Sequence, residues 1–454
     1  MFDQTFPRFI PTRFRDELAA TLRLAAPLAL AQLAQIGMGV TDTVLLGALG
    51  RDALAAGGLG AGMFFTVTAV LQGLVFGVSI LVSHARGAEQ VDKIAPLLRA
   101  GFVLATLTAL PALLVFANIE PVFLAIGEPE KLASDAGAYI AVLAFAAPAA
   151  LWMAVQRSYL AAMNHTRLVL GVAFGALLLN GLLNYGLIHG VWGLPEMGYM
   201  GSCTATLITT WIAMAATAVG MRKMAPLPRD AKPIDWSVVR ELLHLGLPIA
   251  FTLGVEILLF LAAALMMGTL GPTALAAHHV TITVASLTFM VPLGVAQAVN
   301  VRVGFHLGAG DPRAARLAGG AALTLGVSFM ALTAMAMFAG PRQIALLFNL
   351  DPMRGEDAEV IALIVQLMTI AAVFQVFDGA QTIAAGALRG MKDTRVPAVL
   401  AGFSYWGVGF PVAWALGFPF AFGPTGIWWG LAVGLAVAAV VLNTRFWWLS
   451  AKIA

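Results

Sequence analysis

The sequence contains twelve long stretches of mostly apolar residues, separated by charged breaks or by breaks rich in glycine and proline. A helix needs roughly 20 apolar residues to cross the hydrocarbon core of a bilayer. Each stretch therefore predicts one membrane-spanning helix, and together they predict an all-α membrane protein. The expected spans are 18–47, 54–83, 97–118, 134–162, 168–189, 199–221, 240–269, 274–306, 315–339, 359–388, 397–419 and 424–448.

The composition agrees with this prediction. Only 11% of the 454 residues are charged and 60% are hydrophobic, whereas soluble domains average about 25% charged residues. A soluble fold is therefore excluded. The first stretch is too long for a signal peptide, so we expect it to remain as a helix. The single cysteine, Cys203, excludes a disulfide within the chain.

Lysine and arginine predict the orientation. With the N-terminus in the cytoplasm, all of the 26 basic residues except Arg51, Lys131, Arg342 and Arg354 fall on the cytoplasmic side. Arg157 is counted there, near the cytoplasmic end of the fourth span. Short cytoplasmic loops carry such an excess of basic residues. We therefore expect a multi-pass protein of the bacterial inner membrane with both termini in the cytoplasm.

The chain contains an internal repeat. Residues 46–58 read LGALGRDALAAGG, residues 267–279 read MGTLGPTALAAHH, and seven of the thirteen positions are identical at an offset of 221. The predicted domains are an N-lobe, 1–222, with helices 1–6; a cytoplasmic linker, 223–239; and a C-lobe, 240–454, with helices 7–12. Six helices per lobe give both the same orientation, as in transporters that bind substrate between two parallel repeats.

Three of the 23 acidic residues lie deep inside the apolar stretches: Asp42, Glu256 and Asp378. A carboxylate there costs several kcal/mol and marks an ion or proton pathway when it is retained. The alternative is a structural hydrogen bond to a neighbouring helix. The sequence shows no lysine or arginine at a similar depth to neutralise these acids, and this favours the pathway.

Further polar residues, on the same helix and on neighbouring helices, are expected around Asp42. Gln35 and Asp42 are seven residues apart, which places them on one helix face. Asn180 and Asn184 share a face of the fifth helix, and Thr206 lies in the sixth. Such an all-oxygen set suits a hard cation, and it also suits an aspartate that takes and releases a proton. The two asparagines fit interhelical hydrogen bonding equally well.

Motifs for other functions are missing from the sequence. It contains no GxxxxGK[ST] motif for ATP, no HExxH motif and no nucleophile elbow. We therefore expect no enzyme activity, no cofactor, no ATP and no nucleic-acid partner. The histidines show no metal-ligand spacing, and the 19 methionines include ones suited to an adaptable lining for apolar ligands. The expected partners are small organic cations and membrane lipid, and the expected state is a monomer.

Five sequence features resemble the multidrug and toxic compound extrusion (MATE) family, in its NorM-like branch. They are VTDTVLLGALG around Asp42, LPIAFTLGVEILLF around Glu256, FQVFDGAQTIAAGALRGMKDTRVP around Asp378, the motif SYWGVGFP, and the pair Asn180/Asn184. The resemblance covers all twelve spans. It implies two six-helix lobes that form a V, and export of cationic aromatic drugs in exchange for Na⁺ or H⁺.

The resemblance also implies site residues. An N-lobe cation site would contain Asp42, Asn180, Asn184 and Thr206, and a C-lobe cation site, with possible Na⁺, would contain Glu256 and Asp378. Relatives carry an aromatic hydroxyl near the second acid of the C-lobe site, where this chain has Phe374 and no tyrosine on that helix. The residues expected to line a cavity are Gln35, Met266, Phe374, Gln375 and Gln381.

The resulting hypothesis is a multidrug efflux antiporter that works by alternating access, with Na⁺ and H⁺ both open as the coupling ion. One alternative is a lipid-linked precursor flippase of the same superfamily, which usually carries extra helices and a more cationic cavity. Another, from a different class, is an ion channel or sensor. Duplicated lobes with unequal acids favour alternating access over a uniform pore.

Overall fold

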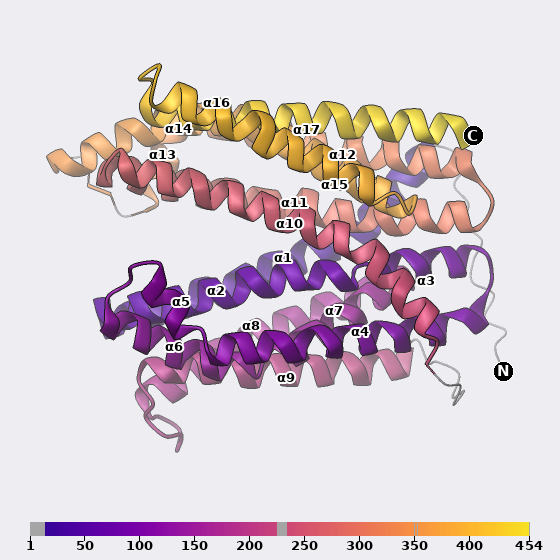
Figure 1. The fold of residues 1–454 in the computed structure, drawn as a ribbon, viewed down its shortest axis with the longest axis horizontal. Helices are drawn as coiled ribbons and strands as arrows, with labels where there is room; N and C mark the ends of the chain where they lie inside the picture. The colour runs from indigo at the N-terminus through magenta and orange to yellow at the C-terminus, as the bar shows by residue number, and fades with distance from the viewer. Residues whose placement is uncertain (1–13, 225–233, 349, 352, 454) are drawn as a thin grey trace.

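A computed structural model describes residues 14–224, 234–348, 350, 351 and 353–453, and these residues are almost entirely helical (Figure 1). The helices of the first half are α1 (Phe14–Leu49), α2 (Arg51–Val75), α3 (Gly77–Gly87), α4 (Val91–Ala117), α5 (Glu120–Ala125), α6 (Glu130–Ala144), α7 (Ala147–Ala162), α8 (Thr166–His189) and α9 (Tyr199–Met224). Those of the second half are α10 (Trp236–Thr269), α11 (Pro272–Gly308), α12 (Pro312–Ala339), α13 (Pro341–Leu346), α14 (Gly355–Gly390), α15 (Arg395–Gly402), the π-helix η1 (Phe403–Gly409), α16 (Phe410–Gly417) and α17 (Gly423–Ile453).

The number of membrane spans agrees with the sequence prediction. Within the described residues, eleven helical segments are long and apolar enough to cross a membrane. Helices α6 and α7 give a twelfth span if they are taken together, with a bend of 48° between them. Pro148 at the start of α7 explains the bend, because its ring removes a backbone N–H and clashes with the carbonyl four residues earlier. The all-α, twelve-span prediction is confirmed.

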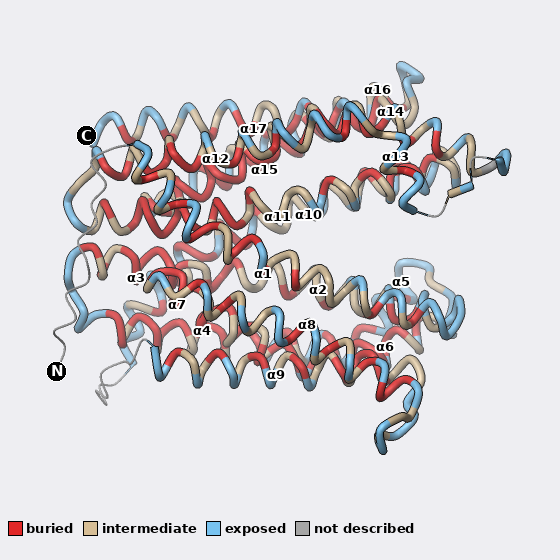
Figure 2. Tube along the Cα trace, turned by 180° about the vertical axis from the view of Figure 1, so that it is seen from behind, coloured by how far each residue is buried: buried red, intermediate tan, exposed pale blue. Residues whose placement is uncertain are grey.

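The helices form two bundles side by side. In Figure 1 most of the first half, α2 to α9, lies below most of the second half, α11 to α17, while α1 and α10 cross between the two bundles. The bundles meet mainly where α1 packs on α11, α10 packs on α2, and α3 packs on α11. They stay close at the end where α1 begins and α17 ends, which we call the terminal end. They diverge toward the other end, where α5 and α13 lie (Figures 1 and 2).

Two glycine contacts between the halves are equivalent under the internal repeat. A Cβ atom on Gly294 would lie 2.6 Å from the backbone nitrogen of Ala29, and one on Gly73 would lie 2.8 Å from the Cα atom of Ala250. Ala29 and Ala250 are related by the repeat offset of 221. Each half therefore presents an equivalent alanine to a glycine of the other half, and a larger side chain at either glycine would push the backbones apart.

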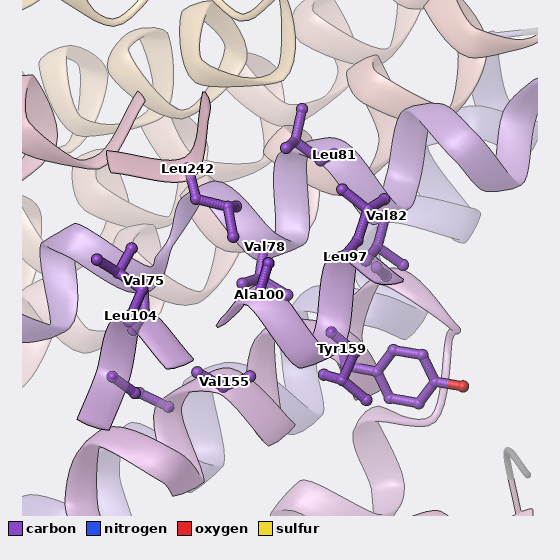
Figure 3. Packing of buried hydrophobic residues seen from close by; sticks show 14 of the residues in the cluster. Val75, Val78, Leu81, Val82, Leu97, Ala100, Leu104, Val155, Tyr159 and Leu242 are labelled. Carbon is purple, nitrogen blue, oxygen red and sulfur yellow. The ribbon is translucent and has the colours of Figure 1, made fainter. Parts of the chain in front are cut away.

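Hydrophobic packing also crosses between the halves. One cluster combines Val78, Leu97 and Val155 of the first half with Leu242 of α10 (Figure 3). A second cluster packs Leu24 and Leu28 of α1 against α11, α12, α14 and α17. Many of the buried residues lie toward the terminal end in Figure 2. Because apolar surface gains little from packing against itself in lipid, this close fit of small residues carries the association.

A buried ion pair joins the halves at the terminal end. Arg302 of α11 donates from Nε to Glu17 Oε1 at 2.8 Å and from Nη2 to Glu17 Oε2 at 2.5 Å. His306 Nε2 lies 3.4 Å from the same carboxylate. Glu17 and His306 are fully buried. Such a bidentate pair fixes the geometry of α1 against α11.

Candidate substrate and cation sites

The first candidate site surrounds Asp42 in α1. Asn184 of α8 donates from Nδ2 to Asp42 Oδ1 at 2.8 Å, and Thr206 of α9 donates from Oγ1 to Asp42 Oδ2 at 3.2 Å. Asn180 Nδ2 in turn lies 3.1 Å from Thr206 Oγ1. Three helices therefore bring together all four residues that the sequence predicts for this site. The i, i+4 spacing of the asparagines puts both amides on the face of α8 that meets α1.

Two oxygen atoms of this site have no hydrogen-bond donor. Asn180 and Asn184 are fully buried, and the side-chain oxygen Oδ1 of each accepts no hydrogen bond. A buried amide oxygen without a donor costs free energy. These oxygens and the Asp42 carboxylate are ligands that a hard cation accepts. A proton on Asp42 would equally supply a donor to one of them.

Asp42 opens onto a cavity in the first half. The cavity has a volume of about 940 Å³, which includes space open to solvent. Apolar and aromatic side chains make up much of its wall, among them Met38, Phe64, Phe65 and Met153. Its polar lining includes Gln35, Gln72, Asn180, Thr206 and Thr209. Aromatic walls and a few polar groups are typical of a site for small organic molecules.

The structure corrects the prediction for Arg157. The sequence predicts Arg157 on the cytoplasmic side, with no basic residue at the depth of the acids. Instead, Arg157 lies inside α7 and lines the cavity together with Asp42. The predicted span also ends at 162, but Arg157 lies more than one helical turn before that end, and its side chain turns inward to α1 instead of toward the cytoplasmic loop. Arg389 likewise lies inside a helix, one residue before the end of α14.

The second candidate site joins α10 to α14 in the other half. The amide nitrogen of Gln381 lies 3.2 Å from Glu256 Oε1 and 3.2 Å from Asp378 Oδ1. Both carboxylates therefore approach the same nitrogen, and their oxygens are held within twice that distance of each other. Asp378 is buried, whereas Glu256 is half-buried. Gln381 is thus part of the acid cluster.

Sequence reasoning missed the aromatic hydroxyl of this second site. Tyr405 donates its hydroxyl to Gln381 Oε1 at 3.0 Å and is fully buried. It comes from η1, inside the SYWGVGFP motif, whereas the family resemblance predicts an aromatic hydroxyl on the helix of Asp378. This segment is a short π-helix, and Gly409 within it packs closely against Gly434 of α17. The bond to Tyr405 turns the Gln381 amide nitrogen toward the acids.

The remaining predicted lining residues lie in two places. Gln35 lines the cavity of the first half. Met266, Phe374 and Gln375 are buried within the second half, where Met266 and Phe374 join its hydrophobic core. Gln375 accepts a hydrogen bond from Thr288 at 2.8 Å and donates to Thr333 at 3.1 Å. The structure therefore places these three in packed surroundings and brings only Gln35 to the cavity.

A duplicated bundle of membrane-spanning helices, with a buried carboxylate at the wall of a cavity in one half, is the architecture of a membrane transporter. The MatE family model matches this chain twice, over residues 27–186 and 248–415. The chain belongs to the MatE family. The two matches also agree with the internal repeat.

Relatives and solved structures support this assignment. The chain is 48% identical over 431 residues to the multidrug resistance protein NorM of Burkholderia vietnamiensis, covering 94% of this chain and 93% of the relative. It is 47% identical over 445 residues to the probable multidrug resistance protein NorM of Burkholderia mallei, covering 96% and 94%.

Two solved structures show the same fold. One is the eukaryotic MATE transporter AtDTX14, with a TM-score of 0.86 and 21% identity over 97% of this chain and 98% of that one. The other is an outward-facing conformation of a multidrug resistance MATE family transporter of the MOP superfamily, with a TM-score of 0.86 and 19% identity over 96% of both chains.

Proposed function

We propose that this protein is a secondary active multidrug efflux antiporter, which exports organic, often cationic and aromatic compounds in exchange for H⁺ or Na⁺. The observation that carries the proposal is the buried Asp42 carboxylate at the wall of a cavity that Phe64 and Phe65 also line. The relatives named as multidrug resistance proteins support it. The proposed location is the bacterial inner membrane, with both termini in the cytoplasm.

Competition for the carboxylate would supply the coupling. An ionised aspartate that loses its water without a cation costs several kcal/mol. The cavity therefore closes readily only when Asp42 carries a proton, a metal cation or the cationic group of a substrate. Because one group replaces another, inward movement of the coupling ion is tied to outward movement of the substrate. One charge crossing the membrane supplies about 2.3 kcal/mol per 100 mV.

The acid cluster of the second half fits a second cation site. Glu256 and Asp378 repel each other when both are ionised, and a proton or Na⁺ ion between them would remove that repulsion. Gln381 and Tyr405 would hold the acids in place while the ion enters and leaves. A metal ion here is cargo, so the protein needs it only during turnover.

Movement of the two halves would expose the cavity alternately to each side. We take 1–222 and 240–454 as the moving lobes and 223–239 as the linker, of which residues 225–233 lie outside the described structure. The small-residue contacts between α1 and α11 and between α10 and α2 are where such rocking would pivot or separate.

The experiment is dye efflux from proteoliposomes with a Na⁺ gradient and a pH gradient imposed separately. The proposal expects one of the gradients to accelerate efflux of a cationic dye such as ethidium. A rate of dye efflux that neither gradient changes would contradict antiport. The double variant Glu256→Gln with Asp378→Asn should lose the acceleration, and full gradient-driven efflux by it would exclude the second site from coupling.

One observation favours a second candidate, a lipid-linked precursor flippase. Arg157 gives the cavity a positive charge, and a cationic cavity suits a phosphate-bearing lipid. Asp42 lies in the same wall, however, and would repel that phosphate. Scrambling of a fluorescent phospholipid in the same proteoliposomes, without dye efflux, would favour the flippase.

A further inference from the structure

Arg157 reaches the cavity through two hydrogen bonds to α1. Its Nη1 atom donates to Gln35 Oε1 at 3.2 Å, and its Nη2 atom donates to Gln32 Oε1 at 2.7 Å. Both acceptors are neutral amides, so these bonds orient the guanidinium without neutralising it. A guanidinium has five N–H donors, and these two bonds leave donors for a ligand.

The charge of Arg157 has no carboxylate partner within the part of the chain that the structure describes. Of the described residues that line the cavity, Asp42 and Arg157 are the charged ones. An unpaired cation in such a wall is costly unless a ligand or water compensates it. The cavity therefore offers one negative and one positive group to whatever binds there.

The two charges lie at different heights in the cavity wall, measured along the axis of α1. Arg157 contacts Gln35, and Gln35 precedes Asp42 by seven residues, or two helical turns, which is about 10 Å of helix. Met38 lies between these positions and also faces the cavity. Phe64 and Phe65 of α2 add aromatic surface to the same wall. A rigid aromatic molecule with opposite charges at its ends matches this arrangement.

We propose that Arg157 is an anion subsite of the cavity, which binds the carboxylate of amphoteric aromatic substrates while Asp42 takes their cationic group. The inference rests on the proposed efflux function and narrows its substrate class. A guanidinium binds a carboxylate through two parallel hydrogen bonds. A substrate with only a positive charge instead meets repulsion from Arg157, which at about 10 Å and an effective dielectric constant of 20 corresponds to roughly tenfold in affinity.

The test uses two dyes that differ only in the acid. Rhodamine 110 has a free carboxylic acid, and rhodamine 123 is its methyl ester. We expect Arg157→Gln to shift the ratio of their apparent affinities in proteoliposome efflux at least tenfold toward rhodamine 123. Arg157→Lys should shift it less, because lysine keeps the charge but loses the bidentate geometry. Arg167→Gln, which removes an exposed arginine outside the cavity, should leave the ratio unchanged.

Three outcomes would overturn the proposal. If Arg157→Gln lowers the apparent affinity for both dyes equally, the role of Arg157 is only to hold α7 against α1. If the wild-type protein exports rhodamine 123 but not rhodamine 110, the subsite does not serve substrates, although the efflux function stands. If it exports neither dye nor ethidium, the efflux function fails as well. Should Arg157→Gln lose all transport, equilibrium binding of both dyes to the purified variant, by fluorescence polarisation, gives the same ratio.

Discussion

The ion pair between Glu17 and Arg302 makes a quantitative prediction about how the two halves separate. The pair joins α1 to α11 through two hydrogen bonds and is almost completely enclosed. Glu17→Gln keeps the shape of the side chain but leaves the guanidinium without its counter-charge. Breaking a buried pair in this way costs about 3–5 kcal/mol. Because the pair forms only while the halves touch at the terminal end, this cost falls on that arrangement alone.

The consequence is a shift in population toward arrangements in which the terminal end is open. A cost of about 3–5 kcal/mol corresponds to a factor of roughly 10² to 5 × 10³ in the equilibrium between the two arrangements. Ser83 of α3 reports this opening, because it is buried beside Gly304 of α11. The only native cysteine, Cys203, can be replaced by alanine beforehand.

The assay is the rate at which a water-soluble maleimide labels a Ser83→Cys variant. We expect Glu17→Gln to raise this rate by at least tenfold. The matched control is Asp393→Asn, which breaks a similar pair, Arg445 Nε to Asp393 Oδ2 at 2.6 Å, within the second half. The control should leave the labelling rate unchanged. Equal rates in Glu17→Gln and the parent would refute the idea that this pair holds the halves together.

Three further predictions concern single side chains. Asp42→Asn should abolish gradient-driven dye efflux in proteoliposomes while the protein still elutes as a folded species, because the amide keeps the shape but cannot bind the coupling ion. Tyr405→Phe should weaken the apparent affinity for the coupling ion by a few-fold to tenfold in the same assay, since it removes the hydroxyl bond to Gln381, worth about 0.5–1.5 kcal/mol; an unchanged ion dependence would show that the bond is irrelevant. Asp235 caps α10 and accepts hydrogen bonds from the Ser237 hydroxyl at 2.6 Å and the Ser237 backbone N–H at 2.9 Å, and these two bonds lower the pKa of Asp235. Asp235→Ala should therefore melt at a lower temperature near neutral pH, and the difference should vanish as the pH falls through the lowered pKa of the folded protein; a difference that persists in strong acid would contradict this.

Hydropathy and the repeat predicted the fold because both are properties of long segments. Twelve apolar stretches are hard to misread when water is excluded from the bilayer. The cluster around Asp42 was also predictable, because the i, i+4 spacing of Asn180 and Asn184 places two amides on one helix face. Local periodicity and burial cost were sufficient for these features.

Arg157 and Tyr405 were not predictable in the same way. Arg157 falls near the end of an apolar stretch, where hydropathy does not distinguish a loop arginine from one that turns inward. Tyr405 reaches Gln381 across 24 residues of sequence, through a π-helix that no hydropathy pattern indicates. Methionine and phenylalanine are side-chain types that often line ligand sites, but Met266 and Phe374 pack against neighbouring helices and belong to the hydrophobic core. Each of these depends on contacts between helices.

Ion movement driven by substrate tests the central claim of antiport most directly. Proteoliposomes would be loaded with an organic cation, diluted into substrate-free buffer with no ion gradient, and followed with an internal pH dye and with radioactive Na⁺ outside. Antiport predicts that H⁺ or Na⁺ enters as the substrate leaves, and that the ion entry disappears in Asp42→Asn. Substrate exit without entry of either ion would contradict the account.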